Sequence, residues 1–244
     1  MIASKRNLRF EVRYTYDFIR RFLPLPGRRL LEIGCGTGDL AARLTEDGFQ
    51  ITAIDSDQEL VAAAGRLGVN ARVAEWPEFD DGHFDAVLFT RSLHHIQPLR
   101  DAVQHAAACL SKSGRIIVED FAYEYADEKT LRWLSSAVRL LDAAGLLVER
   151  DELLDAVLRE GASLALWRQH HGHDLSTAAE IETTLTDVGG VLKENAAYYF
   201  RYLARAMGNL EKRDAVCEAL VKQEEDLISN LEIIPLGRRF VVVP

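Results

Sequence analysis

Apolar and polar positions follow two alternating periods along residues 28–121. Short apolar runs, typical of strands that are buried on both faces of a sheet, are separated by segments with helical spacing of their apolar residues. The predicted strands are Leu30–Ile33, Ile51–Ile54, Ala71–Ala74, Phe84–Thr90 and Arg115–Glu119. The predicted helices between them are Asp39–Glu46, Asp57–Leu67 and Leu99–Leu110. Strands and helices that alternate in this way predict a doubly wound, mostly parallel sheet.

Helical patterns dominate on both sides of that segment. A helix is predicted over Phe10–Phe22, because the chain there has helical spacing and ends at Pro24. After the fifth strand, a helical cap is expected. Its predicted helices are Asp127–Ala144, Asp151–Arg159 and Thr177–Asp187.

Two late strands are expected to close the sheet. The aromatic run Ala197–Leu203 and the final segment Ile233–Val243 flank a predicted helix over Glu211–Asn230. Both segments are rich in residues that favour strands, although Pro235 restricts its strand to an edge or a bulge.

Length and composition fit one folded domain. The chain has 244 residues, of which 48% are hydrophobic and 27% charged, and this is ordinary globular usage. We expect a single domain over 1–244. Its parts would be an N-terminal helix (1–27), a ligand-binding core (28–121), an inserted helical cap (122–192) and the closing strands and helix (193–244).

The charge and the cysteines narrow the function classes. The net charge of −9 repels a polyphosphate backbone. Three scattered cysteines, no apolar leader and no run of about 18 apolar residues predict a cytoplasmic protein with no membrane partner. The paired basic residues are interpreted as solvated rims without a function. They are Lys5–Arg6, Arg20–Arg21, Arg28–Arg29 and Arg238–Arg239.

Three glycines join the first predicted strand to the helix that follows it. Gly34, Gly36 and Gly38 permit a tight turn, and without side chains they let a ligand approach backbone N–H groups closely. At the end of the next strand, the carboxylate of Asp55 is placed to accept hydrogen bonds from both hydroxyls of a ribose. The two features predict a nucleotide-like ligand.

The residue after the loop separates two nucleotide ligands. A dinucleotide-binding loop would place its third glycine at position 39, beside a helix N-terminus that is free for pyrophosphate. This chain has Asp39 there, and Glu32 at the end of the first strand. Two carboxylates oppose a diphosphate but suit a ligand with a sulfonium and an ammonium group. The electrostatics therefore favour S-adenosylmethionine over NAD, and an NAD-dependent oxidoreductase is the least favoured alternative.

In their order along the chain, these features resemble a known family. The loop Glu32–Gly38, then Asp55, then Phe84–Val87 is similar to the class I S-adenosylmethionine-dependent methyltransferases, specifically the small-molecule type 11 group. The similarity covers residues 28–121. It implies a Rossmann-like sheet of seven strands with an antiparallel last strand, and S-adenosylmethionine as the cofactor.

The resemblance also implies which residues surround the cofactor. Asp55 would bind the ribose, with Ser56 beside it. After the third strand, Glu75 would accept from the adenine amine and Trp76 would stack on the ring, although packing under the loop explains Trp76 equally well. Thr90 would contact the methionine end through its backbone. The other implied contacts to the methionine part are Glu32, Gly34, Cys35, Gly36 and Gly38.

Candidate catalytic residues follow the central strands. Methyl transfer is an in-line displacement that needs alignment, and a protein base is optional. The segment Thr90–Ile96 resembles the family's LHH segment and lies where doubly wound folds bind ligands. His94 or His95 can deprotonate an acceptor, with only one expected to face the pocket, and a structural role for both stays open. Asp120 is a further candidate, with a helix cap or an arginine pair as its alternatives.

A histidine-rich stretch and an aromatic run supply candidate substrate contacts. The compact spacing within Trp167–Asp174 is unlike that of structural zinc sites, so no metal is expected. The similar family often has a Trp followed by a His-containing stretch here, which implies substrate contacts from Trp167, His170 and His173. In the aromatic run, Tyr199 is the candidate whose hydroxyl lines the acceptor pocket, and packing explains the other rings.

The sequence thus predicts an enzyme that methylates a small molecule at oxygen or nitrogen. A nucleic-acid methyltransferase is one alternative, although the chain is acidic and lacks an Asn-Pro-Pro-Tyr or Asp-Pro-Pro-Tyr segment after the fourth strand. A non-catalytic module that binds S-adenosylmethionine is another. We expect no nucleic-acid partner, and a monomer or a homodimer.

Overall fold

The chain forms two compact units. The computed structural model describes residues 8–26, 28–172 and 174–244. One unit comprises the residues up to 120 together with 178–194 and 238–244. The other comprises residues 121–177 and 195–237. We call them the sheet unit and the helical unit.

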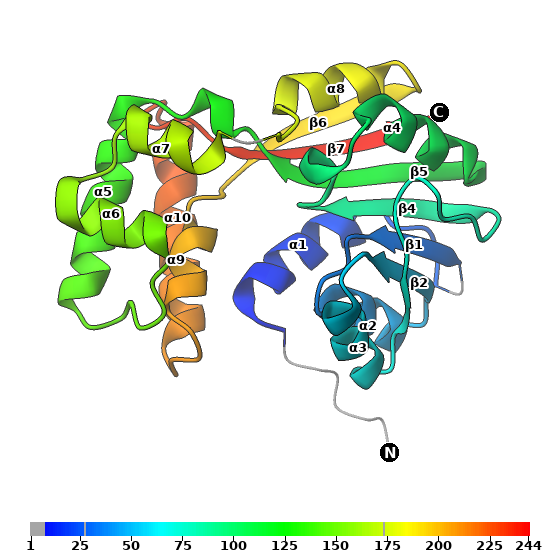
Figure 1. The fold of residues 1–244 in the computed structure, drawn as a ribbon, viewed down its shortest axis with the longest axis horizontal. Coiled ribbons are helices and arrows are strands. Elements are labelled where there is room, and N and C mark those ends of the chain that lie inside the picture. The colour runs from blue at the N-terminus through cyan, green and yellow to red at the C-terminus, as the bar shows by residue number, and fades with distance from the viewer. Residues whose placement is uncertain (1–7, 27, 173) are drawn as a thin grey trace. The chain divides into compact units, whose positions relative to one another are not determined.

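A seven-stranded sheet forms the centre of the sheet unit (Figure 1). The strands are β1 (Arg29–Ile33), β2 (Gln50–Asp55), β3 (Asn70–Val73), β4 (Phe84–Thr90), β5 (Leu110–Phe121), β6 (Gly190–Ala196) and β7 (Gly237–Val243). Their order across the sheet is β3-β2-β1-β4-β5-β7-β6. Strands β1 to β5 pair in parallel, whereas β7 is antiparallel. The predicted doubly wound sheet with an antiparallel last strand is confirmed.

Helices cover both faces of this sheet. On one face lie α1 (Phe10–Arg20), α2 (Asp39–Glu46) and α3 (Gln58–Arg66), and on the other lie α4 (Leu99–Ala108) and α8 (Ala178–Thr186) (Figure 1). Successive residues of β4 alternate between two apolar clusters, with Leu88 on the side of α1 to α3 and Val87 and Phe89 on the side of α4. Burial on both faces explains why the central strands read as continuous apolar runs.

The parallel strands bring polar residues to one edge of the sheet. Glu32, Asp55, Thr90 and Asp120 all lie at or near the carboxyl ends of their strands. The register places Ile33 opposite Ile54 and Phe89, so these strand ends lie side by side. This is the edge at which doubly wound folds bind ligands.

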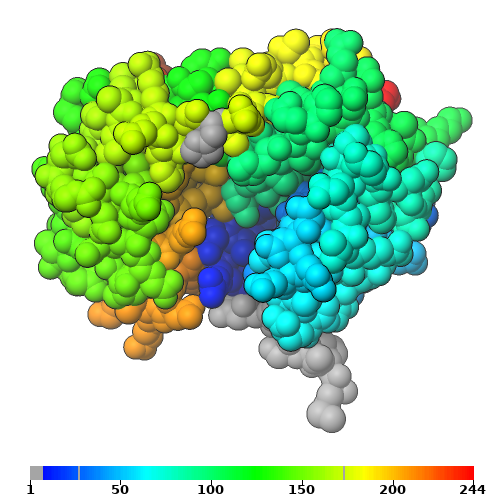
Figure 2. Space-filling view, in the orientation of Figure 1, coloured from blue at the N-terminus to red at the C-terminus, as the bar shows by residue number. Residues whose placement is uncertain are grey.

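The helical unit consists of five helices and a short 3₁₀ turn among its described residues. The turn is Tyr123–Tyr125, and the helices are α5 (Glu128–Ala143), α6 (Glu152–Glu160), α7 (Leu164–His171), α9 (Phe200–Ala206) and α10 (Arg213–Ser229). Asp127, Asp151 and Ser163 each accept a hydrogen bond from an N–H of the first turn that follows, and such capping fixes where α5, α6 and α7 begin. Residues of α6 and α7 form part of the face visible in yellow-green in Figure 2.

The late elements differ from the sequence prediction. The last-but-one strand is Gly190–Ala196, whereas the aromatic run Ala197–Leu203 leads into the helix α9. The carboxylate of Glu224, on α10, accepts hydrogen bonds from the N–H groups of Tyr198, Tyr199 and Phe200, and this favours a helix start over a strand. The expected cap, residues 122–192, also contains α8, which belongs to the sheet unit.

Candidate functional site

The glycine loop between β1 and α2 requires residues without side chains. Gly34 and Gly38 have φ of +73° and +78°. A Cβ at Gly34 would lie 2.5 Å from the Cβ of Ser92, and one at Gly38 would lie 2.5 Å from the Cβ of Ala64. Ser92 in turn donates its hydroxyl to the carbonyl of Ile33 at 2.6 Å. The loop is therefore packed closely against the segment after β4 and against α3, as a close-approach turn demands.

Asp55 is tied to this loop. Its carboxylate accepts from the N–H of Gly36 at 2.8 Å through one oxygen and from the N–H of Asp57 at 3.0 Å through the other. Each carboxylate oxygen can accept more than one hydrogen bond. Asp55 thus has a fixed orientation and retains acceptor capacity toward the pocket that it lines.

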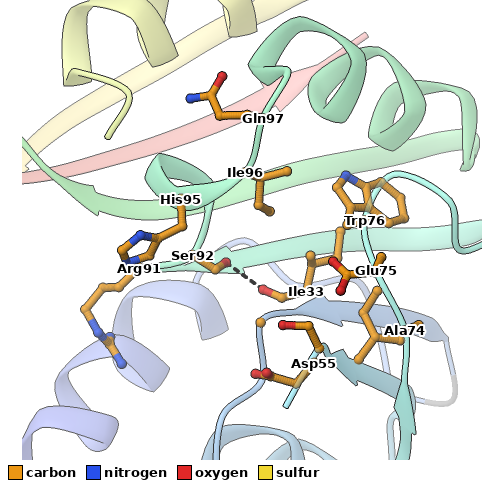
Figure 3. A pocket seen from close by; sticks show the side chains of 13 residues that line it. Ile33, Asp55, Ala74, Glu75, Trp76, Arg91, Ser92, His95, Ile96 and Gln97 are labelled. Carbon is orange, nitrogen blue, oxygen red and sulfur yellow. Dashed lines mark hydrogen bonds between the residues drawn. The ribbon is translucent and has the colours of Figure 1, made fainter. Parts of the chain in front are cut away.

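A pocket of about 560 Å³ lies at this edge of the sheet. Figure 3 shows Asp55, Glu75, Trp76 and His95 around it, and these residues come from the end of β2 and from the segments that follow β3 and β4. Of the predicted cofactor contacts, the pocket brings together Gly34, Asp55, Ser56, Glu75 and Trp76. The others are in the loop or in the strands and do not line it: Glu32, Cys35, Gly36, Gly38 and Thr90.

Glu32 is a buried acid with one oxygen left over. Its side chain is 1% exposed, and Oε1 accepts from the hydroxyl of Thr90 at 3.2 Å. Among the described residues, Oε2 has no hydrogen-bond partner. Burial, together with the nearby charges of Asp39 and Asp55 and against the effects of Thr90 and Arg91, raises the pKa of Glu32 to about 8. A buried carboxyl of this kind suits a cationic ligand group that would stabilise its ionised form.

Cys35 lies between two of the loop glycines. Burial, with the charges of Glu32 and Asp55, raises the pKa of its thiol to about 12. A thiol with such a pKa stays protonated at neutral pH and is a poor nucleophile. Cys35 is therefore an uncharged residue of the loop.

Trp76 belongs both to the pocket wall and to the core. It lines the pocket but is only 7% exposed. Its indole nitrogen donates to the carbonyl of Ala102 at 3.1 Å, and its ring centroid lies 4.6 Å from that of His105. Helix α4 thus fixes the ring, while the neighbouring Glu75 is exposed at the pocket.

The two adjacent histidines have different surroundings. His94 is buried, and its Nδ1 lies 2.6 Å from Oδ1 of Asp120. The backbone N–H of His94 donates to the other oxygen of the same carboxylate at 3.2 Å. His95 is exposed and lines the pocket, with its ring centroid 4.0 Å from that of His94. Of these two histidines, only His95 lines the pocket.

A buried ion-pair network lies beside the site and was not recognised in the sequence. Glu119 is 2% exposed and accepts from Arg239 at 2.8 Å, from Arg91 at 3.3 Å and from the hydroxyl of Thr15 at 2.6 Å. Arg91 has φ of +62°, unusual for a residue with a side chain. The network joins α1, β5, β7 and the end of β4.

One prediction about the basic pairs is wrong. Arg238 and Arg239 were interpreted as a solvated rim, but they are 8% and 7% exposed. Arg239 is buried because Glu119, 120 residues earlier, neutralises it, and a buried charge requires such a partner. The pair Lys5–Arg6 lies outside the described residues.

The predicted substrate residues lie in the helical unit. Trp167 is buried and lines a second pocket of about 410 Å³ within that unit. Tyr199 is fully buried, with its ring centroid 5.9 Å from that of Trp167. His170 is half-buried and does not line the pocket, whereas His171, which was not singled out, does. His173 lies outside the described residues.

Two features are absent from the described part of the chain. It contains no group of three or more His, Cys, Asp or Glu residues arranged to hold a metal ion. It also contains no helix with the length and apolar character needed to cross a bilayer.

Comparison with known proteins gives matches over most of the chain. The profile of a family described as "Methyltransferase domain" matches residues 5–173. A ubiquinone biosynthesis O-methyltransferase of Xanthomonas campestris is 30% identical over 195 residues, which cover 73% of this chain and 72% of that protein. An uncharacterized methyltransferase of Mycobacterium bovis is 35% identical over 107 residues, but the match spans only 44% of its length and 42% of this chain.

Solved structures share the fold at low sequence identity. The [4+2]-cyclase SpnF has a TM-score of 0.59 at 20% identity, covering 96% of this chain and 81% of that one. The plantazolicin methyltransferase BpumL in complex with SAH has a TM-score of 0.52 at 14% identity, covering 96% and 82%. From the profile match and the Xanthomonas relative, we conclude that the chain belongs to the class I S-adenosylmethionine-dependent methyltransferase family.

Proposed function

We propose that the chain transfers a methyl group from S-adenosylmethionine to a small-molecule acceptor, at oxygen or nitrogen. The observation that carries the proposal is Glu32, a buried carboxyl whose Oε2 has no partner among the described residues. The charge of Asp55, which lines the pocket, acts on Glu32, so Glu32 lies within electrostatic reach of the pocket. Such a group has the chemistry to stabilise an ammonium or a sulfonium and to repel a diphosphate.

The residues around the pocket fit this cofactor. Asp55, oriented by two backbone N–H groups, would accept from the ribose hydroxyls. Glu75 is exposed at the pocket and would accept from the adenine amine, against the wall that Trp76 forms. Ser56 would lie at the ribose, and Thr90 would act through Glu32, to which its hydroxyl donates. When bound, S-adenosylmethionine supplies a methyl group on a sulfonium.

His95 would act on the acceptor. It is exposed at the pocket, and an imidazole can take a proton from a hydroxyl or an amine near neutral pH. His94 and Asp120 would be positioning residues, because Asp120 holds both the ring and the backbone N–H of His94. Their pairing fixes the short turn Leu93–His95 that carries His95.

The acceptor class is supported by relatives as well as by charge. The Xanthomonas relative is named for O-methylation, and one solved neighbour is a phosphoethanolamine N-methyltransferase from Haemonchus contortus. Both names indicate small acceptors. The net charge of −9 argues against nucleic acid as the acceptor. SpnF, a cyclase, is a reminder that this fold can serve other chemistry.

Calorimetric titration of the purified protein with S-adenosylhomocysteine tests the proposal, with NAD as a parallel control. We expect S-adenosylhomocysteine alone to bind, with micromolar affinity. Binding of NAD alone, or of neither compound, would overturn the cofactor assignment. Binding of S-adenosylhomocysteine without any S-adenosylmethionine turnover across phenols, amines and thiols would contradict the catalytic part and favour a non-catalytic module.

A further inference from the structure

The pocket of the helical unit is complete within that unit. It has a volume of about 410 Å³, and its lining includes Tyr123, Leu164, Trp167, His171 and Leu175. Volumes of about 300 to 1,000 Å³ are usual for pockets that take small molecules. The 3₁₀ turn at Tyr123 and helix α7 supply most of this lining, so the walls come from two adjacent elements.

Three rings form a continuous wall of this pocket. Tyr123 and His171 are nearly parallel, with ring centroids 5.8 Å apart and an interplanar angle of 13°. The ring of Trp167 also contacts His171, with the two ring centroids 4.1 Å apart. Such faces and edges favour contact with a further flat ring.

The donor groups of this wall are already used inside the protein. The indole nitrogen of Trp167 donates to the carbonyl of Tyr123 at 2.9 Å, and the hydroxyl of Tyr123 donates to the carbonyl of Leu175 at 3.1 Å. The rings are thus held in place by hydrogen bonds to the backbone. Tyr123 is half-buried and leaves a ligand the most ring surface, whereas Trp167 and His171 are 2% and 5% exposed and pack beside it.

His171 is held at both ring nitrogens by hydrogen bonds. Its Nδ1 lies 2.9 Å from the carbonyl of Trp167, and because a carbonyl only accepts, this nitrogen carries the hydrogen. Nε2 lies 2.9 Å from the hydroxyl of Tyr202, which can donate to it or accept from it. Burial raises the pKa of Tyr202 well above its usual value, so that hydroxyl stays protonated. Both nitrogens are occupied, so His171 serves as a wall and takes no part in proton transfer.

We propose that this pocket binds the flat ring of a neutral, phenol-like aromatic molecule. Glu124, Arg168 and Asp174 also line the pocket, and this set of two acids and one base disfavours an anion. Arg168 is exposed, whereas Trp167 is buried, so the ring would enter first and its hydroxyl would face the charged residues. The identification of this molecule as the methyl acceptor rests on the proposed function.

The test compares 2-naphthol with decahydro-2-naphthol, its saturated counterpart, by calorimetry on the whole chain without cofactor. We expect 2-naphthol to bind about 2- to 10-fold more tightly, the ratio that an aromatic contact supplies. Equal affinities would mean that the pocket has no preference for an aromatic ring. Absence of 2-naphthol binding would mean that the pocket is not a binding site for such molecules. Either result overturns the proposal.

Matched variants locate the binding. Leu164→Trp fills the pocket and should abolish 2-naphthol binding, whereas Leu140→Trp, at an exposed position of α5, should leave it unchanged. Tyr123→Leu should weaken binding, and Tyr123→Phe, which keeps the ring, should restore it. Undiminished binding to Leu164→Trp contradicts the location. A separate titration with S-adenosylhomocysteine distinguishes failure here from failure of the cofactor assignment, since Leu164→Trp should retain that binding.

Discussion

Two buried glutamates show how differently the two units treat a carboxyl group. Glu32 in the sheet unit accepts one hydrogen bond, from Thr90, and its second oxygen has no partner among the described residues. Glu224 in the helical unit accepts from three backbone N–H groups and uses both oxygens. Burial raises the pKa of both acids, to about 8 and about 7 respectively.

The difference is that Glu224 is used by the fold, whereas Glu32 has an oxygen that pairs with no described residue and fits the binding role proposed for it. Glu224 supplies the acceptors that the start of α9 needs, so its removal would leave buried donors unsatisfied. Glu32 satisfies no backbone group, so the fold alone gives little reason for its burial. An acid buried at a cost, next to a pocket, is a candidate for binding.

The largest effect is expected from Glu224→Ala. The change leaves three buried N–H groups without acceptors and should lower the free energy of unfolding by about 3 kcal/mol. Urea unfolding followed by circular dichroism measures it. Glu225→Ala, at the exposed neighbouring position, is the control and should change stability by less than about 0.5 kcal/mol. Equal effects of the two variants would remove the structural role of Glu224.

Asp55→Ala should weaken S-adenosylhomocysteine binding by about 1.5 to 3 kcal/mol, the usual worth of a hydrogen bond to a charged group. This corresponds to a roughly 10- to 100-fold rise in Kd, measured by calorimetry. Asp55→Asn, which keeps an oxygen acceptor, should have a smaller effect. If a folded Asp55→Ala variant binds as tightly as the parent, the ribose does not lie at Asp55.

Gly34→Ala and Gly36→Ala test the loop geometry. Both residues have positive φ, but only at Gly34 would the new Cβ meet another atom, whereas the space around Gly36 is open. Gly34→Ala should therefore cost about 1 kcal/mol more stability than Gly36→Ala. Thermal unfolding of the two variants gives the difference, and equal stabilities would contradict the close contact with Ser92.

Glu32→Gln should change stability least at pH 7, because a side chain with a pKa of about 8 is already mostly protonated there. The variant differs from the parent protein in how its free energy of unfolding depends on pH. The raised pKa stabilises the folded state fully below about pH 4.5, and this contribution is lost as pH rises through about 8. Across that range, the free energy of unfolding should therefore change less with pH in Glu32→Gln than in the parent protein.

Calorimetry in buffers of different ionisation enthalpy sharpens the same point. If the cofactor's ammonium stabilises ionised Glu32, binding of S-adenosylhomocysteine at pH 7 releases a proton from the parent protein. The Glu32→Gln variant should release none. The same proton release from both proteins would show that Glu32 does not ionise on binding.

The sequence predicted local elements well where local signals determine them. The bounds of α2 and β4 agree with the prediction, since a glycine loop precedes one and a continuous apolar run forms the other. β5 begins at Leu110, five residues before the predicted start at Arg115, because Leu110 already pairs with Phe84 across a bulge. Pairing with residues of β4 extends β5, and the sequence of β5 alone does not reveal this pairing.

Long-range pairs account for what the sequence did not predict. β6 has an exposed Lys193 and begins at a glycine, so its pattern is that of a loop, and its strand form depends on pairing with β7. The helical start at Phe200 depends on Glu224, and the burial of Arg239 depends on Glu119. In the candidate site, the glycine loop and Asp55 predicted where the pocket lies. That His95 lines it while His94 pairs with Asp120 depends on how the ends of β4 and β5 lie side by side, which the sequence does not show.

The position of β7 has a consequence for how the chain folds as it is synthesised. β7 follows every other strand along the sequence, yet it lies between β5 and β6 in the sheet. β1 to β5 can pair as soon as they leave the ribosome, because segments synthesised earlier tend to fold first. β6 must wait about 40 residues for its neighbour, with a bare edge exposed meanwhile. Nascent chains that stop before residue 237 should therefore be those most prone to aggregate.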